Sequence, residues 1–440
     1  MRYPEVVSYL DSFVNYEKIP AYHYNESLNL DRVKNFLGAI GNPQDALKCI
    51  HIAGSKGKGS TCAFIAHILS RAGYRVGLYT SPHLIDFRER IRILDGKKIF
   101  RQGVFAGMIS RRDLSRLVEE FRPAIDGYNR KSPFGPLTYF EVYTCLAYLY
   151  FKKRQPDLVV LETGLGGRLD ATNVVRPVVC AITPISYEHT DKLGTTLGKI
   201  AFEKAGIITE AGSSVISAPQ PREAGVVIRR KARAAGARLY EVGKQIKFYP
   251  GPKGTLTVKG LSGKYSDLRP GLSGAHQFIN AAVAIGVIEQ LKDPGVKVSL
   301  SQIRSGLAHT RWPGRAEVLS RNPLIILDGA QNLASARAIK ETVEKNFHYR
   351  KLILVFGISQ DKDIQGVTRV FTDLADLVVL TRSANPRAVP PDKLTIFFRN
   401  KDTRVTRNVD QARKLALGLA GKQDLILVTG SLFVVGEFKR

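Results

Sequence analysis

The chain has 440 residues, enough for two or three domains, and 44% of them are hydrophobic, as in ordinary globular proteins. No apolar stretch reaches about 18 residues, so the sequence predicts no membrane-spanning helix. Lysine and arginine number 66 against 39 aspartates and glutamates, which gives a net charge of +27. The basic residues are dispersed and no nucleic-acid-binding motif is present. A solvated basic surface is therefore favoured over a nucleic-acid partner.

The four cysteines lie far apart and form no Cys-x-x-Cys pair. This spacing is typical of reduced, mostly buried thiols in a cytoplasmic protein. The N-terminus has no basic segment followed by an apolar one, so we expect no signal peptide. The cysteines are Cys49, Cys62, Cys145 and Cys180.

The first predicted elements lead into a glycine-rich turn. Residues 1–48 are predicted to be mainly helical with a turn at 41–43, and the apolar run 49–53 predicts a buried strand. Three glycines follow within six residues, and apolar residues at helical spacing then predict a helix that ends near Gly73. A strand, a glycine-rich turn and a helix N-terminus together form an anion site, because backbone N–H groups and the helix dipole converge there.

The side chains of this turn suit nucleotide phosphates. Lys58 is expected to reach the outer phosphates, and Ser60 or Thr61 to hold Mg²⁺. The strict P-loop pattern does not match, because Gly59 separates Lys58 from Ser60. A glycine-rich turn with solvated lysines is the structural alternative, but the strand–helix context favours phosphate binding.

The next strand is predicted at 75–80. Pro82 ends it, which places Ser81 at its carboxyl end, where parallel sheets bind ligands. Residues 86–100 are charged and mixed, and they predict no regular element. Beyond them the sequence predicts a helix at 110–122, a loop at 127–136 and a helix at 137–151.

A second candidate ligand ends the strand predicted at 157–162. Glu162 is placed as the acid of a Walker B strand would be, although many strands end in an acid. The polar, glycine-rich segment 163–173 predicts a functional loop. After it come a predicted strand at 178–183, the polar segment 188–191 and a helix that contains Lys204.

The rest of the chain falls into two parts. Short strands and Gly/Pro turns at 239–268 predict a small β appendage, and residues 312–315 are the best linker candidate. Beyond the linker, strands alternate with helices, which predicts a second doubly wound domain. The other predicted elements before the linker are a strand at 213–217, a basic helix at 221–235 and an alanine-rich helix starting within 272–280. Those after it are strands at 324–327, 351–356, 376–380 and 425–429 and helices near 333–346, 364–374 and 410–420.

These elements predict the fold class α/β. Residues 1–312 are expected to form a P-loop ATPase domain with a central, mostly parallel sheet and the small β appendage. Residues 313–440 are expected to form a smaller Rossmann-like α/β domain.

In combination, the motifs resemble those of the folylpolyglutamate synthase/dihydrofolate synthase family, a branch of the Mur ligases. The resemblance covers nearly the whole chain in order. It implies an ATP-dependent, amide-forming ligase that adds L-glutamate to dihydropteroate or reduced folates through an acyl phosphate. Residues 1–312 would bind ATP, two Mg²⁺ ions and the folate, and residues 313–440 would be the glutamate ligase domain of a monomer. The motifs are residues 51–61, 81–84, 162–173, 189–191, 203–207, 313–315, 328–330, 355–357, 361–363, 386–388 and 430–432.

The resemblance also implies roles for single residues. Lys58, His189 and Lys204 are the catalytic candidates, and Lys204 is expected to be carbamylated, which turns it into an oxygen ligand. Ser81 and Glu162 are expected to hold one Mg²⁺, and Glu162, His189 and Lys204 the second. The nucleotide is expected on Gly57, Lys58, Gly59, Ser60, Asn280, Arg315 and Asp328. The pterin substrate is expected on Thr138, Tyr139, Phe140, Glu141, Leu169, Asp170 and Ala171.

Each of these residues has a structural alternative when it is taken alone. Ser81 also suits a turn before a proline, His189 a protein surface, and Lys204 a helix surface where it would pair with Glu203. Phe140 also suits a core. Asn280 and Asp328 suit helix caps, and Arg315 suits a linker.

Three positions depart from the family pattern. Lys56 stands where many members have Asn, though some have Lys, and Glu188 stands where Asp usually precedes His189. Gln331 stands where the pattern has His, and because Gln carries no charge we do not assign it to the site.

Three other functions stay open at this point. A Mur-type ligase acting on a cell-wall precursor would share the chemistry, but we see no dedicated N-terminal uridine-nucleotide domain. A basic P-loop nucleic-acid motor would fit the net charge, but it needs further ATPase motifs that we do not find. A non-catalytic binding module would show no substrate-dependent ADP release.

Overall fold

The computed structural model describes residues 1–19, 22–96, 103, 105–291 and 295–440, so predictions for the other positions are not tested. The chain divides into two compact units. The first consists of Met1–His83, Arg88–Gly271 and Phe278–Thr310, and the second of Leu84–Phe87, Leu272–Gln277 and Arg311–Arg440.

A seven-stranded sheet forms the centre of the first unit. Its strand order is β3-β2-β4-β1-β5-β6-β7, and every neighbouring pair is parallel except β2 with β3. The central strands are mostly apolar and buried, as expected for a parallel sheet that is covered on both faces. Their bounds are β1 Cys49–Ala53, β2 Arg75–Tyr79, β3 Ile91–Asp95, β4 Leu158–Glu162, β5 Pro177–Ile182, β6 Ser214–Ser217 and β7 Arg238–Glu241.

The strand register brings predicted ligands to one edge of this sheet. β1 lies between β4 and β5, where Ile52 pairs with Glu162 and Ala53 pairs with Ile182. β2 flanks β4 on its other side and ends at Tyr79. Four strands therefore end side by side, and the residues after them share the edge where α/β proteins bind ligands.

Helices pack on this sheet. α4 (Lys58–Arg71) contacts β1 to β4, and α11 (Leu300–His309) packs on α4. α8 (Leu197–Ala205) and α9 (Arg222–Ala234) share one apolar cluster with β5 and β6. The other helices before the second sheet are α1 Tyr3–Asp11, α2 Tyr24–Ser27, α3 Leu30–Ala39, α6 Tyr139–Arg154, α7 Thr190–Leu193 and α10 His276–Gln290, with 3₁₀ turns η1 Pro43–Ala46 and η2 Phe87–Arg90.

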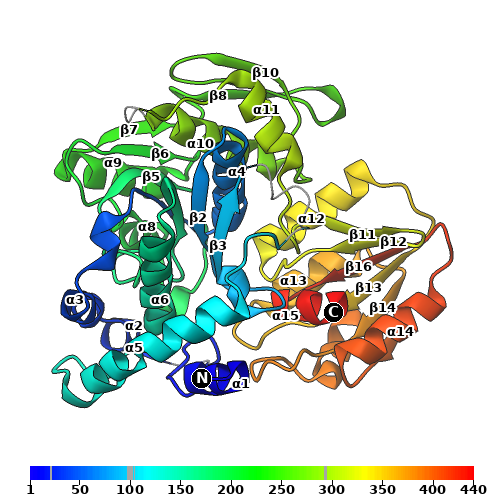
Figure 1. Cartoon of the computed structure of the whole chain (residues 1–440). Coiled ribbons are helices and arrows are strands. Elements are labelled where there is room, and N and C mark those ends of the chain that lie inside the picture. The colour runs from blue at the N-terminus through cyan, green and yellow to red at the C-terminus, as the bar shows by residue number, and fades with distance from the viewer. Residues whose placement is uncertain (20–21, 97–102, 104, 292–294) are drawn as a thin grey trace. The chain divides into compact units, whose positions relative to one another are not determined.

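The helix predicted at 110–122 is longer in the structure. α5 (Arg111–Lys131) continues through Pro123 into the segment predicted as a loop (Figure 1). Tertiary contact stabilises the extra turns, since the Tyr128 ring packs edge-on against Phe36 at 5.3 Å. The predicted end was wrong because proline and glycine lower helix propensity locally, whereas packing decides the outcome.

The charged segment 86–100 contains a strand that the sequence did not predict. β3 pairs antiparallel with β2 at one edge of the sheet. Arg92 in this strand is buried, and its side chain donates to the carbonyl of Ala106 at 2.9 Å. A buried arginine hides the apolar–polar alternation by which such a strand is recognised.

Residues 239–268 belong to two sheets. β7 pairs parallel with β6, so the first part of this segment extends the main sheet. The predicted small β appendage is the antiparallel sheet β10-β9-β8. Its bounds are β8 Lys247–Pro250, β9 Leu256–Lys259 and β10 Lys264–Leu268, with the 3₁₀ turn η4 Pro252–Gly254.

A six-stranded sheet forms the centre of the second unit. Its order is β11-β12-β16-β13-β14-β15, parallel throughout except for β11 with β12. The four predicted strands are confirmed, whereas the two edge strands β11 and β15 were not predicted. The bounds are β11 Glu317–Arg321, β12 Leu324–Leu327, β13 Leu352–Phe356, β14 Leu377–Leu380, β15 Asp402–Val405 and β16 Leu425–Thr429.

Alternate residues of these strands enter two cores on opposite faces. Ile326 and Leu354 lie in one core with α12 and α13, and Leu327 and Val355 lie in the other with α14 and α15. Helices thus cover both faces of the sheet (Figure 1). The bounds are α12 Leu333–Asn346, α13 Ile364–Thr372, α14 Val409–Leu419 and α15 Leu432–Lys439, with the 3₁₀ segment η5 Pro391–Phe398.

The α/β fold class is therefore confirmed, with mostly parallel sheets in both units. Among the helices that the structure describes, none has the length and apolar character needed to span a bilayer.

Candidate functional site

The turn between β1 and α4 has the backbone geometry of an anion site. Gly57 has a φ of 85°, in the left-handed region that favours glycine. A Cβ here would also lie only 2.2 Å from Oδ1 of Asn280. α4 begins at the next residue, Lys58, and the first backbone N–H groups of a helix have no acceptor within it. Helix N-termini of this form bind phosphate.

Two lysines converge on the carbonyl of Gly54 in this turn. Nζ of Lys58 donates to it at 3.2 Å, and Nζ of Lys204 donates to it at 2.8 Å. Lys58 lies at the start of α4 and Lys204 near the end of α8, so the fold brings together two lysine side chains that are far apart in sequence. The ammonium group of Lys58 suits a site that binds phosphate oxygens.

Lys204 is almost completely buried, with 1% of its surface exposed. Burial is the main reason why the pKa of Lys204 falls from 10.5 to about 7, and Lys58 and Lys56 lower it while Glu188 raises it. Lys204 therefore loses its proton more readily than an exposed lysine does. A neutral amine is the form that reacts with carbon dioxide to give a carbamate.

Glu162, at the end of β4, lies beside the residue that follows β2. The backbone N–H of Ser81 donates to Oε2 of Glu162 at 3.2 Å. Glu162 is buried, with 5% exposed. The two residues predicted to share one Mg²⁺ are therefore neighbours, as the strand register requires.

His189 lies at the end of a segment that is held against the phosphate turn. The N–H groups of Ser55 and Lys56 both donate to the carbonyl of Pro184 at 3.1 Å. The hydroxyl of Ser55 donates to the carbonyl of Ser186 at 3.0 Å. His189 has a φ of 50°, which non-glycine residues seldom adopt and which clusters at functional sites.

Glu188 connects this segment with the turn through a side-chain contact. It forms an ion pair with Lys56, and its Oε1 lies 3.8 Å from Nε2 of His189. Burial by itself would raise the pKa of Glu188, but Lys56, Lys204 and Lys58 hold that pKa well below its usual value. The carboxylate is therefore ionised and faces a concentration of positive charge.

Asp170 organises the loop at 163–173. Its Oδ2 accepts the N–H groups of Gly164 and Leu165, both at 2.9 Å. Its Oδ1 accepts the N–H of Thr172 at 3.0 Å and the Thr172 hydroxyl at 2.5 Å. Burial raises the pKa of Asp170, and these hydrogen bonds act in the opposite direction. The carboxylate thus fixes the loop backbone.

His51 in β1 extends the hydrogen-bond network of Asp170 from the loop into the sheet. Nε2 of His51 lies 2.8 Å from Oγ1 of Thr172, whose hydrogen is donated to Asp170. We therefore assign the Nε2–H tautomer, which donates to Thr172. Within the described part of the chain, Nδ1 of His51 has no hydrogen-bond partner. Burial lowers the pKa of His51 to about 3, so the ring is neutral.

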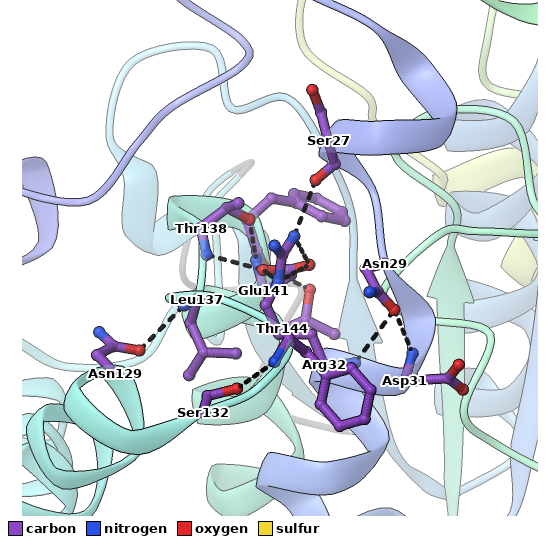
Figure 2. A network of polar contacts seen from close by, with 12 residues as sticks. Ser27, Asn29, Asp31, Arg32, Asn129, Ser132, Leu137, Thr138, Glu141 and Thr144 are labelled. Atoms are coloured by element: carbon purple, nitrogen blue, oxygen red, sulfur yellow. Dashed lines mark hydrogen bonds and ion pairs between the residues drawn. The ribbon is translucent and has the colours of Figure 1, made fainter.

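The start of α6 carries four of the predicted substrate residues. Thr138 is the N-cap and forms a capping box with Glu141, whose Oε2 accepts the Thr138 N–H at 2.7 Å. The Glu141 carboxylate also pairs with Arg32, and Figure 2 shows the guanidinium reaching both this carboxylate and the carbonyl of Ser27. The polar atoms of Thr138 and Glu141 are thus engaged in structural contacts.

Phe140 and Tyr139 differ in their surroundings. Tyr139 is buried, and its ring stacks on Tyr143 at 5.8 Å. Phe140 is half-buried, and its ring lies against the loop, because a Cβ at Gly164 would come within 2.6 Å of it. The loop residues Leu169 and Ala171 are partly and almost fully buried. Phe140 is therefore where the two predicted substrate stretches meet.

Glu203, next to Lys204, is held by two partners from other elements. Arg168 pairs with its carboxylate, with Nη2 to Oε1 at 2.9 Å, and the Tyr24 hydroxyl donates to Oε2 at 3.1 Å. These contacts fix the end of α8. Glu203 is therefore paired with Arg168, and not with Lys204 as the structural alternative supposed.

The second unit contains the remaining predicted nucleotide residues. Asp328 follows β12, and its carboxylate accepts the N–H groups of Ala316 at 2.8 Å and Ala330 at 2.9 Å. Burial raises the pKa of Asp328, and Arg315 acts in the opposite direction. Arg315 and Asp328 thus form a local group at the carboxyl end of a parallel strand.

Comparison with known proteins gives matches over the whole chain. A dihydrofolate synthase/folylpolyglutamate synthase of Bacillus subtilis is 33% identical over 417 residues, covering 93% of this chain and 94% of that relative. The chain belongs to this family. The Mur ligase, glutamate ligase domain family matches residues 314–432.

Solved structures of this family superpose closely on the chain. Mycobacterium tuberculosis folylpolyglutamate synthase, in complex with ADP and AMPPCP, has a TM-score of 0.87 and 29% identity, with 100% of this chain and 98% of that chain covered. Escherichia coli FolC in complex with DHPP and ADP has a TM-score of 0.85 and 28% identity, with coverage of 99% and 96%.

The folylpolyglutamate synthase family fold thus places several predicted residues together in the first unit. Gly57 lies against Asn280, Lys58 and Lys204 share one carbonyl, Ser81 contacts Glu162, and Glu188 lies beside His189. The roles of these residues, of Gly59 and Ser60, and of Arg315 and Asp328 stay predictions.

Other residues of the site were missed from the sequence. His51 and Thr172 were not singled out, although they carry the network below the loop. Arg32 was not predicted as the partner of Glu141. The Thr-x-x-Glu spacing of a capping box was readable and indicates the structural role of Thr138. Lys56 and Glu188 were noted separately, and nothing in the sequence says that they touch.

Among the described residues, no group of three or more His, Cys, Asp and Glu side chains could hold a metal ion. Of the predicted metal residues, Glu162 offers a carboxylate, Ser81 a hydroxyl and His189 a ring nitrogen, and the family resemblance implies a carbamate on Lys204. Oxygen donors suit Mg²⁺, which keeps several waters and is held by few protein ligands.

Proposed function

We propose that the protein is an ATP-dependent ligase that joins L-glutamate to dihydropteroate, to reduced folates, or to both. The observation that carries this proposal is the 33% identity with the Bacillus subtilis enzyme over nearly the full length of both chains. The phosphate-type turn at β1–α4 supplies the site that the chemistry needs. The relatives are named as folate enzymes. This supports the proposed function over that of a Mur-type ligase acting on a cell-wall precursor.

The proposed reaction forms two bonds in sequence. A carboxylate oxygen of the pterin substrate bonds to the γ-phosphorus of ATP while the bond to ADP breaks. The α-amino nitrogen of glutamate then bonds to the acyl carbon, inorganic phosphate leaves, and the nitrogen loses a proton as the amide forms. Negative charge shifts among phosphate oxygens in both steps, so the site must hold positive groups in fixed positions.

The turn and its lysines meet this requirement. The backbone of Gly57, Gly59 and Ser60 is proposed to hold the phosphates of ATP. Lys58 exchanges the Gly54 carbonyl for a phosphate oxygen when the nucleotide binds, because a charged acceptor makes the stronger hydrogen bond. Asn280, Arg315 and Asp328 are proposed as further nucleotide contacts.

Two Mg²⁺ sites are part of the proposal. Ser81 and Glu162 hold one site, and Glu162, His189 and Lys204 the other. Bound Mg²⁺ would neutralise phosphate charge and orient the γ-phosphate. Lys204 fits such a site only as a carbamate, since an ammonium group would repel the cation, and its lowered pKa supports carbamylation.

The pterin substrate is proposed to lie on the ring of Phe140, next to the loop that Asp170 fixes. Leu169, Ala171, Thr138, Tyr139 and Glu141 are the other proposed contacts. Because Asp170, Thr138 and Glu141 already use their polar atoms within the protein, their contribution is to shape the pocket.

We further propose a monomer in the cytoplasm with no nucleic-acid partner. The four free, buried cysteines fit a reducing compartment.

The test is ADP release by the purified protein with ATP, Mg²⁺ and glutamate and a panel of pterins. Dihydropteroate and tetrahydrofolate with one or several glutamates form the panel, and omission of glutamate is the control. We expect release that needs both the pterin and glutamate. Release no greater than that of ATP alone with every pterin would overturn the proposal.

A further inference from the structure

Two of the positions that depart from the family pattern are in contact. Lys56 lies in the phosphate turn and Glu188 precedes His189, 132 positions further along the chain. Nζ of Lys56 forms an ion pair with Oε2 of Glu188. Both side chains are largely buried, with 27% and 15% of the side-chain surface exposed. Each departure therefore supplies the partner of the other.

The backbone around this pair is already connected. Ser55 and Lys56 donate their N–H groups to Pro184, and the Ser55 hydroxyl donates to Ser186. These contacts hold the segment 184–186, but they end before His189. The ion pair extends the connection to the residue next to His189, whose backbone is in the left-handed region.

Charge gives the pair a second role. The Glu188 carboxylate lies against Lys56 in the turn where a second lysine, Lys58, reaches the carbonyl of Gly54. The Glu188 carboxylate therefore offsets part of the positive charge around the turn. Without Lys56, this carboxylate would face the incoming phosphates with less compensation, and phosphate binding would weaken.

The two side chains also match in length. Asn at position 56 would be shorter and uncharged, and Gln at position 188 would keep the length of Glu without its charge. Either change alone leaves the charge of the other residue without its partner, whereas both together leave no unpaired charge. The pair therefore predicts that the second substitution does less harm in the presence of the first.

We propose that Lys56 and Glu188 act as one positioning unit, in which the ion pair fixes the segment carrying His189 against the phosphate-binding turn. The inference rests on the proposed function, because it treats the turn as the ATP site. Neither residue is proposed to touch the reacting atoms. A direct phosphate contact by Lys56 is the competing explanation.

The test is a double-mutant cycle with Lys56→Asn, Glu188→Gln and the two combined. Dissociation constants for MgATP are measured by calorimetry without a pterin, and kcat and KM are measured by ADP release. We expect Lys56→Asn to weaken MgATP binding by roughly tenfold, because Glu188 then repels the phosphates. We expect Glu188→Gln to lower kcat by on the order of tenfold to 100-fold through misplacement of His189, with ATP affinity within about threefold of wild type.

The double variant decides between the explanations. If the pair is one unit, Lys56→Asn/Glu188→Gln recovers ATP affinity to within about threefold of wild type, because no unpaired carboxylate faces the phosphates, and its kcat is no lower than that of Glu188→Gln alone. If Lys56 itself binds phosphate, the double variant keeps the affinity loss of Lys56→Asn, which overturns the proposal. Single variants that behave as wild type overturn it too.

A second ion pair in the first unit provides the matched control. Lys153 on α6 and Glu120 on α5 form the same type of contact at the surface, with 48% and 50% of the side chains exposed. Lys153→Asn, Glu120→Gln and their combination should leave ATP affinity and kcat unchanged. Melting temperatures of all variants show whether a loss of ATP affinity or activity reflects unfolding. Recovery of ATP affinity in the double variant would exclude unfolding as the cause.

The MgATP measurement separates this inference from the proposed function. If the wild type binds MgATP but releases no ADP with any pterin, the proposed function fails while the affinity part of the cycle still tests the pair. If the wild type is active and the cycle is additive, only the pair is refuted.

Discussion

At the scale of single residues, Lys58 is the side chain on which the proposed chemistry depends most. It lies at the first position of α4 and points back to the carbonyl of Gly54. We expect Lys58→Ala to reduce turnover by at least about 100-fold, because a positioned cation at the phosphates contributes several kcal/mol to transition-state stabilisation. The steady-state rate of ADP release measures this. Lys58 is partly exposed, so the circular dichroism spectrum should not change. Turnover within tenfold of wild type would contradict the assignment.

Lys204 permits a chemical rescue experiment. Lys204→Ala should lose activity, and short carboxylic acids should partly restore it, because a diffusible carboxylate can replace the carbamate oxygens. Lys204→Arg is the control, since a guanidinium group keeps the charge but cannot form a carbamate under these conditions. ADP release measured with and without added acetate or formate tests the prediction. Full activity of Lys204→Arg would disprove the ligand role.

His51 gives a prediction about pH and stability. Its pKa is about 3 in the folded protein and 6.5 in the unfolded chain. Between these values the unfolded chain binds more protons, so the free energy of unfolding falls as pH drops from 6.5 towards 3, by at most about 1.4 kcal/mol per pH unit. His51→Gln should reduce this loss. Urea unfolding at pH 7.5, 5.5 and 4.5 measures it, and exposed His348→Gln is the control that should leave the pH dependence unchanged.

At the scale of elements, the start of α6 tests whether its polar residues are structural. Arg32 and Glu141 are buried, with 8% and 4% of their side chains exposed. Arg32→Ala should cost about 3–5 kcal/mol of stability, because it leaves a buried carboxylate unpaired. Thr138→Ala should cost about 1 kcal/mol through loss of the N-cap. Chemical denaturation measures both.

Two further variants complete this test. The double variant Arg32→Met/Glu141→Leu should lose less stability than Arg32→Ala alone, because no charge is left buried. Breaking the exposed pair Lys345–Glu341 on α12 by Lys345→Ala should cost at most about 0.5 kcal/mol. If Arg32→Ala instead leaves stability intact and raises only the KM for the pterin, the start of α6 serves the substrate directly.

The elements also show where local sequence is a sufficient guide. The strand–turn–helix at residues 49–71 and the strands β12, β13, β14 and β16 were predicted, because apolar runs and glycines mark them. α5 was predicted too short and β3 was missed. In both cases a residue that disfavours the element locally, Pro123 or Arg92, is tolerated because tertiary contacts compensate for it.

At the scale of the whole molecule, the open question is which pterins the enzyme uses. We expect both addition of glutamate to dihydropteroate and extension of reduced folates, since activation of a carboxylate is the same in both. Dihydropteroate has no glutamate, so its ring must lie deeper to bring its carboxylate to the γ-phosphate. Phe140→Ala should therefore reduce turnover of dihydropteroate more than folate extension. ADP release with each substrate measures the ratio, and no release with dihydropteroate would restrict the enzyme to folates.

The sequence by itself determined the α/β class, the phosphate turn, most of the strands and the family. These features depend on local patterns: apolar runs, glycine spacing and short motifs whose order along the chain is informative. Such patterns are visible because each helix or strand must form the hydrogen bonds of its own backbone and bury its own apolar side chains.

Only the tertiary structure decided how the site side chains are partnered. It placed Lys58 and Lys204 on one carbonyl, Glu141 against Arg32, and Lys56 against Glu188. The partners in these pairs come from different elements, up to 150 positions apart. The sequence around a charged or hydrogen-bonding side chain does not show which residue it will contact. The strand order and register of the folded sheet decide which loop ends become neighbours.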